Sequence, residues 1–117
     1  MRRIQVRNQT RDRGLAAAAG VADSSAERRT GLLKHTSLEE GDGLWIVPCE
    51  AVHTFWMKFP IDVVYLDRQR RVVKVRGRMA PWRMSGCWRA HSVLELPAGL
   101  AERTGTSPGD QLEFTKL

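Results

Sequence analysis

The sequence lacks the features that mark several specialised classes of small protein. Two cysteines in 117 residues exclude a disulfide-dense mini-protein. No stretch approaches the roughly 20 consecutive apolar residues that a helix needs to span a bilayer. A composition that is 42% hydrophobic and 27% charged excludes a disordered tail. No repeat or low-complexity linker divides the chain, so we expect one domain over residues 1–117 and no membrane partner.

Acidic residues are scarce in the two segments that carry most of the positive charge. Residues 1–13 hold five arginines against Asp12, and residues 68–89 hold eight basic residues and no acidic one. The rest of the chain holds six basic and twelve acidic residues, which leaves a net charge of +6 overall. Such strips are typical of solvated faces or of nucleic-acid contacts.

Motifs of the common nucleic-acid-binding modules are absent as well. The chain has no RNP aromatic pattern, KH loop, zinc finger or helix-turn-helix signature. Within the basic strip at residues 70–89, however, basic side chains recur on one face of a predicted strand. Trp82 and Trp88 lie just after that strand. Nucleic-acid binding through this strip is therefore the least favoured of three functional hypotheses.

Short alternating segments between turn residues predict a mostly β fold. The clearest strand covers residues 61–66, and a turn leads from it into a second strand at residues 71–78. A capping-box pattern beginning at Ser24 predicts one α-helix near residues 24–34. Residues 15–22 fit a helix by their alanine content or a strand by their position. We expect a small antiparallel sandwich or barrel of six to eight strands.

Side chains of varied chemistry are concentrated between Cys49 and Asp62. A thiol, an imidazole, a thioether, an ammonium group and a carboxylate occur within fourteen residues. As a zinc site the pattern is incomplete, because it has neither CxxC nor HxxxH, and a further ligand would have to be His91 or Cys87. Cys49 and His53 also have the residue types of a catalytic pair. The structural alternative is a half-buried cysteine and a histidine that hydrogen-bonds to the backbone.

Asp62 is flanked only by apolar residues in its predicted strand. Alternation places Ile61, Val63 and Tyr65 on one face and Asp62 on the other. Because burying a lone charge is costly, Asp62 is expected to have a partner, either Lys58 or an arginine of the next strand. Two roles stay open: an ion pair that fixes strand register, or a site carboxylate beside His53.

Six ordered motifs resemble a known family, the domain of unknown function 192. They are Arg29-Thr-Gly-Leu-Leu33, Gly43-Leu-Trp45, His53-Thr-Phe-Trp-Met-Lys58, Pro60-Ile-Asp-Val-Val-Tyr-Leu-Asp67, Val93-Leu-Glu-Leu-Pro-Ala-Gly99 and Gly109-Asp110. The resemblance implies a compact mostly β fold with a helix after the second strand, and therefore a strand at residues 15–22. It implies no reaction.

The chain departs from the family pattern in three respects. Leu33 stands where members often have Met, and Phe59 stands where they often have Asn. Many members begin with an export signal, whereas the Arg-rich start of this chain precedes only a short run of alanines. We therefore expect a cytoplasmic protein in which Cys49 and Cys87 are free thiols.

The leading hypothesis is a non-catalytic β domain that binds a small molecule or a protein ligand without a cofactor or metal. Its predicted site comprises His53, Trp56, Met57, Lys58 and Asp62, with Glu95 nearby if the two motif blocks meet. The alternative is a hydrolase-like enzyme that uses Cys49 with His53, or a metal ion held by His53, Cys49 and His91.

Overall fold

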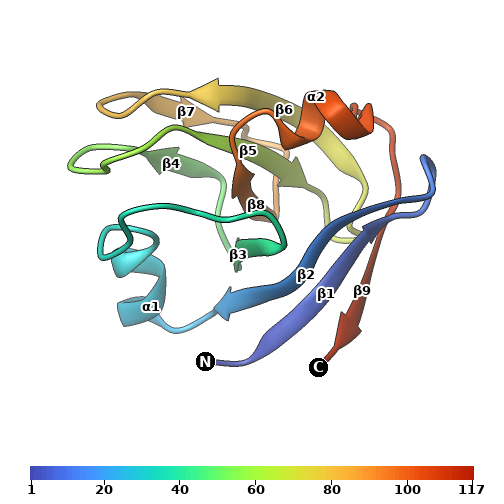
Figure 1. Cartoon of the computed structure of the whole chain (residues 1–117), viewed down its shortest axis with the longest axis horizontal. Helices are drawn as coiled ribbons and strands as arrows, with labels where there is room; N and C mark the ends of the chain where they lie inside the picture. The colour runs from blue at the N-terminus through green and yellow to red at the C-terminus, as the bar shows by residue number, and fades with distance from the viewer.

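Seven strands form one strongly curled sheet in the computed structural model, which describes all 117 residues (Figure 1). Neighbouring strands run antiparallel except for one parallel pair, β2 and β3. In hydrogen-bonded order the strands are β6 (Val72–Met79), β5 (Ile61–Leu66), β8 (Ser92–Pro97), β3 (Asp42–Ile46), β2 (Arg13–Ala22), β1 (Arg3–Asn8) and β9 (Leu112–Lys116).

Two short strands and two short helices complete the fold. Strand β4 (Ala51–His53) pairs with β7 (Met84–Gly86) in a separate small sheet, and the helices are α1 (Ser25–Thr30) and α2 (Leu100–Thr104). Neither helix is long and apolar enough to cross a membrane. The mostly β prediction is confirmed, with nine strands instead of six to eight. Strands β4 and β7 have three residues each, too few for alternation to reveal them.

The ambiguous residues 15–22 lie in β2, as the family resemblance implied. Helix α1 begins as its capping box predicts: the Ser24 hydroxyl accepts the Glu27 N–H at 3.1 Å. The helix ends at Thr30 instead of near residue 34 because Gly31 takes a φ of +49°. The two parts of the prediction thus differ in outcome: the start is confirmed and the length is wrong.

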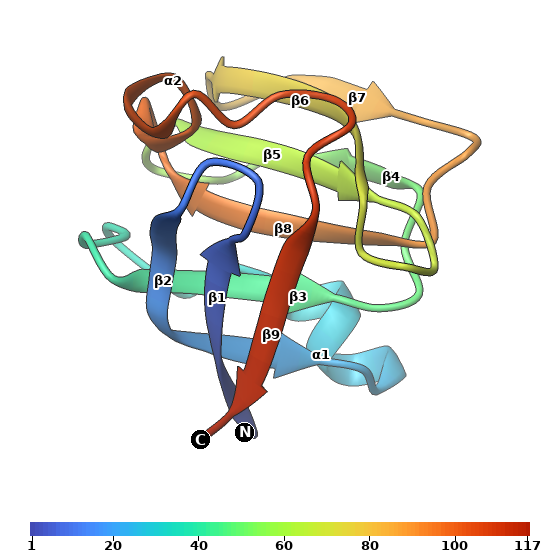
Figure 2. The ribbon, with the colours of Figure 1, turned by 90° about the vertical axis from the view of Figure 1, so that its right-hand side faces the viewer.

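The curl of the sheet brings its first and last strands together. The loop before β6 and the segment leading into β9 form an isolated bridge, Arg71 with Gln111. Beside it, the Val72 N–H donates to the Asp110 carbonyl oxygen at 2.8 Å. Figure 2 shows β1 and β9 running steeply across β3, whereas β3, β8 and β5 run nearly level, so that the sheet folds back over itself. The result is a half-barrel.

The sheet carries a separate core on each of its two faces. All six residues of β5 are buried, because alternate side chains enter different cores. The inner core fills the half-barrel and includes Val64 and Leu94, with α2 closing one end. The outer core includes Val63 and Val93 and is covered by the residues after α1 and by the β4–β7 sheet.

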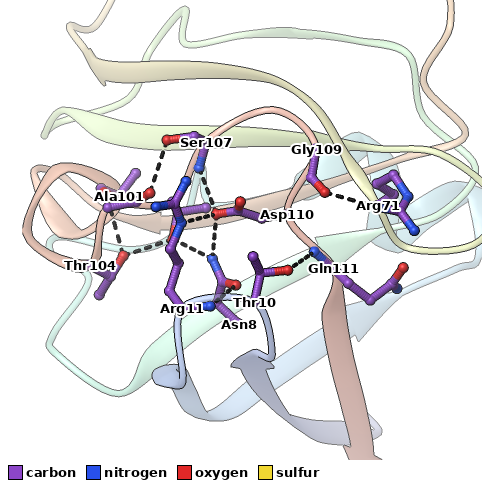
Figure 3. A network of polar contacts seen from close by, with 12 residues as sticks. Asn8, Thr10, Arg11, Arg71, Ala101, Thr104, Ser107, Gly109, Asp110 and Gln111 are labelled. Carbon is purple, nitrogen blue, oxygen red and sulfur yellow. Dashed lines mark hydrogen bonds and ion pairs between the residues drawn. The ribbon is translucent and has the colours of Figure 1, made fainter.

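A buried carboxylate, Asp110, fastens the segment before β9 to the turn between β1 and β2 (Figure 3). It accepts hydrogen bonds of 3.0 Å from Asn8 Nδ2, Arg11 Nε and the Ser107 N–H. Burial by itself raises the pKa of Asp110, but the hydrogen bonds from Arg11, Asn8 and Ser107 outweigh it and the net shift is downward. Asp110 therefore stabilises the fold at neutral pH, and this contribution is lost as pH falls through the lowered pKa.

Candidate ligand-binding site

A cavity of about 540 Å³ lies on the outer face of the sheet. One wall is α1 and the turn that follows it, with Arg28 and Arg29 among its residues. Cys49 and His53 line the opposite side, together with the other residues around β4. The sheet itself contributes Glu95 from β8. The volume is in the range of sites that hold small organic molecules.

Glu95 is the most unusual group in this cavity. Its side chain is only 4% exposed, and no protein donor hydrogen-bonds to its carboxyl oxygens. On its strand it lies between Leu44 of β3 and Val63 of β5, both apolar. Burial raises the pKa of Glu95 to about 7, with no cation or hydrogen bond to oppose the shift. The cavity therefore holds a carboxyl group that is poised between its two protonation states at neutral pH.

Two further residues predicted for the site, His53 and Met57, line the same cavity as Glu95. Met57 is 7% exposed and belongs to the outer core, so it contributes apolar surface. The ring of His53 stacks on Phe55 at a centroid distance of 4.9 Å, which holds the imidazole at the edge of the cavity. The motif block of residues 53–58 and the block of residues 93–99 therefore meet at this cavity, which was the condition for including Glu95 in the site.

Trp56 and Lys58 lie on the loop that carries Met57, but they do not line the cavity. Trp56 is 71% exposed and contacts Trp82 edge-on at a centroid distance of 4.7 Å. Buried Thr54 joins their two loops, since its carbonyl oxygen accepts the Trp82 N–H and its hydroxyl donates to the Ala80 carbonyl oxygen. Trp56 and Trp82 thus form an exposed aromatic pair beside the loop that carries Met57.

Asp62 lies on the face of the sheet opposite to Glu95. Val63 is paired with Glu95 and enters the outer core, so the preceding residue points inward. The Asp62 carboxylate accepts the backbone N–H groups of Arg78 at 2.8 Å, Gly99 at 3.0 Å and Ala101 at 2.8 Å. The prediction of a cationic side-chain partner is therefore wrong, because three backbone donors at the start of α2 and the end of β6 satisfy the charge.

Of the groups in the alternative enzyme hypothesis, Cys49 and His53 line the same cavity, whereas His91 does not. His91 lines a second cavity, which it shares with Cys49 but not with His53, and its carbonyl oxygen accepts the Cys49 N–H at 2.9 Å. No three His, Cys, Asp or Glu side chains are grouped closely enough to hold a metal ion. The Cys49 thiol donates to the Ala51 carbonyl oxygen at 3.2 Å, and burial raises its pKa. A raised pKa favours the thiol over the nucleophilic thiolate.

Several cations of the basic strip contact other groups of the protein. Arg70 lies over the ring of Phe114 at 4.6 Å, and Lys74 donates to the Gly86 carbonyl oxygen at 2.8 Å. Arg71 donates to the Gly109 carbonyl oxygen at 3.0 Å. Irregularities in the register between β5 and β6 also break the regular alternation of cations along the strand, on which the nucleic-acid hypothesis depended.

Sequence reasoning missed Arg28 and Arg29 as members of the site. The capping box placed them on a helix, but no local pattern shows where a six-residue helix docks. Cys49 was assigned only to the enzyme alternative, although it lines the same cavity.

Comparison with known proteins identifies the family. The model of DUF192, described as "Uncharacterized ACR", matches residues 6–114. The chain belongs to the DUF192 family. Related proteins include UPF0127 protein PH1112 of Pyrococcus horikoshii, which is 30% identical over 92% of this chain and 96% of its own length. A second relative, UPF0127 protein PYRAB11210 of Pyrococcus abyssi, is 32% identical over 80% of this chain and 83% of its own length.

Two crystal structures share the DUF192 fold. A protein of unknown function from Novosphingobium aromaticivorans superposes with a TM-score of 0.81 at 24% identity, over 95% of this chain and 83% of that one. A Sinorhizobium meliloti protein, suggested by its name to be a transcription regulator, superposes with a TM-score of 0.83 at 21% identity, over 97% and 92%. At these identities the likeness concerns the fold.

Proposed function

We propose that this DUF192 protein binds a small organic ligand in the Glu95 cavity and does not transform it. The observation that supports the proposal most strongly is the carboxyl group of Glu95, which lines the cavity on a residue only 4% exposed and accepts no hydrogen bond from the protein. Polar groups in protein interiors are nearly always hydrogen-bonded, so an unpartnered one beside an open cavity indicates an external partner.

A ligand with an N–H or O–H donor would complete the hydrogen bonding of Glu95. Met57 and Ile46 would supply apolar contact to the rest of the molecule, and His53 would border the entrance. This division between apolar walls and a few polar groups is typical of small-molecule sites. The site proposed here keeps His53, Met57 and Glu95, adds Arg28, and leaves Asp62 as a structural residue.

The absence of an activated nucleophile favours binding over catalysis. The Cys49 pKa is raised, and its sulfur is hydrogen-bonded within its own loop. We propose further that the protein acts in the cytoplasm, where both Cys49 and Cys87 would stay reduced as the free thiols that they are here.

A thermal-shift screen with a library of polar metabolites tests the proposal. The wild type, Glu95→Gln and Glu113→Gln are compared at pH 7. Glu113 is an exposed carboxylate on β9, away from the cavity, and serves as the matched control. A ligand at a hundred times its Kd adds about 2.7 kcal/mol of stability, so we expect Tm to rise by about 10 °C in the wild type and in Glu113→Gln.

In Glu95→Gln the same ligands are expected to raise Tm by less than half as much. The proposal is wrong if every stabilising compound acts equally on Glu95→Gln, or if no compound in the library stabilises the wild type. Near-ultraviolet circular dichroism of the three proteins checks that the substitutions leave the fold intact.

A further inference from the structure

We propose that the ligand of the Glu95 cavity is an aminocarboxylate, an organic acid whose ammonium group binds Glu95 and whose carboxylate binds Arg28 and Arg29. This inference rests on the proposed function and names its ligand class. It follows from the distribution of charge around the cavity, which is of opposite sign on two walls.

The positive wall is formed by the last turn of α1. Arg28 and Arg29 line the cavity, and neither forms an ion pair with a protein carboxylate. Arg28 Nη1 donates to the Asp23 carbonyl oxygen at 2.8 Å, which holds its guanidinium in place without neutralising it. A fixed guanidinium with further free donors is suited to a carboxylate, which it can contact through two nitrogens.

The negative wall is the sheet, and its charge belongs to Glu95. The two walls do not neutralise each other, since Glu95 forms no ion pair with Arg28 or Arg29. In agreement with this, burial alone raises the Glu95 pKa. Cys49 lines the same cavity and is affected by both charges: its pKa, raised most by burial, is also raised by Glu95 and lowered by Arg28. The cavity thus separates two uncompensated charges of opposite sign, and a ligand must span it to satisfy both.

Ligands with a single charge fit this arrangement less well. A simple amine would pair with Glu95 but leave Arg28 and Arg29, which line the same cavity, without an anionic partner. A simple carboxylate would pair with the arginines but would meet Glu95 either as a repelling charge or only after Glu95 takes up a proton. A molecule with both groups satisfies both walls, which is the electrostatic complementarity that specific sites show.

The test uses a series of aminocarboxylates in isothermal titration calorimetry at pH 7. Glycine, β-alanine, γ-aminobutyrate and ε-aminocaproate place the same two charges at increasing separation. Each is compared with its N-acetyl derivative, which lacks the ammonium group, and with its amide, which lacks the carboxylate. We expect at least one member to bind about tenfold or more tightly than both derivatives, because each removes one charge-assisted contact.

Variants and proton counting test each wall separately. Glu95→Gln and the double variant Arg28→Gln with Arg29→Gln are each expected to weaken binding about tenfold, whereas Lys34→Gln, an exposed cation just beyond α1, leaves it unchanged. An ammonium group lowers the Glu95 pKa from about 7, so binding at pH 7 should release about half a proton per ligand. Titrations in two buffers of different ionisation enthalpy measure this number.

Several results would overturn the inference. Equal binding of the N-acetyl derivatives would show that no cation is required, and proton uptake would show that the ligand is an anion facing protonated Glu95. If no aminocarboxylate binds while other metabolites stabilise the wild type through Glu95, the ligand class is wrong and the proposed function stands. If no compound depends on Glu95, both are wrong.

Discussion

Asp62→Ala is expected to lower the free energy of unfolding by about 4 kcal/mol, because it leaves buried backbone donors without an acceptor. The carboxylate is fully buried and accepts the N–H groups of Arg78, Gly99 and Ala101. These groups belong to the end of β6 and the start of α2, which are otherwise joined by the exposed ion pair of Arg78 with Glu102 at 3.6 Å. Since small proteins are stable by only about 5 to 15 kcal/mol, the variant should be close to unfolding at room temperature.

Asp62→Asn is the matched control for this result. Its side-chain oxygen can still accept from Arg78 and Gly99, while its amide group faces the Ala101 N–H and cannot accept from it. We expect a loss of about half that of the alanine variant. Urea unfolding followed by fluorescence measures both. A loss below about 1 kcal/mol in Asp62→Ala would mean that water or another group replaces the carboxylate, contrary to the role assigned here.

Wild-type stability is expected to fall by about 3 kcal/mol between pH 4.5 and pH 7, relative to Glu95→Gln. Burial raises the Glu95 pKa to about 7, whereas in the unfolded chain it keeps its ordinary value near 4.5. Between these values the native state binds a proton that the unfolded state has released, so the free energy of unfolding decreases as pH rises. Above the folded pKa both states are ionised and this contribution becomes constant.

The variant isolates this effect because all other titrating groups are common to both proteins. Chemical unfolding at half-unit steps of pH gives the two curves, whose difference should slope downward through this range and flatten at alkaline pH. Asp110 has the opposite effect on stability, because its pKa is lowered and its stabilising contribution is lost as pH falls. That contribution changes only at acidic pH. A difference that does not vary with pH would show that Glu95 has a partner in solution.

Local sequence patterns predicted those parts of the fold that depend on alternation and on capping. Strand β5 and the start of α1 form where Ile61–Leu66 and the Ser24 capping box indicate. Alternation also assigned Asp62 correctly to the face opposite Val63. The strands β4 and β7 were missed. They are short and pair only with each other, and neither has a turn pattern beside it that would indicate a strand.

The composition of the site depends on contacts between distant segments, which is why the sequence predicted only part of it. Glu95 lies on the outer face because its register pairs it with Leu44 of β3 and Val63 of β5, which both belong to the outer core. Arg28 lies there because α1 lines the same cavity. Asp62 was assigned a cationic partner because a buried charge suggests an opposite charge. Backbone N–H groups satisfy the buried carboxylate equally well, and because every residue but proline has one, the sequence does not show which of them will donate to it.

The central claim is that Glu95 is an unpartnered carboxyl group at a ligand cavity. The most direct test is a carbon NMR titration of the Glu95 side-chain carboxyl in the ligand-free protein, with resonances assigned by comparison with Glu95→Gln. We expect a midpoint at a pH of about 7, as burial without a partner requires. A midpoint near the ordinary value of 4.5 would contradict the claim, because it would mean that the carboxylate is hydrated or already paired.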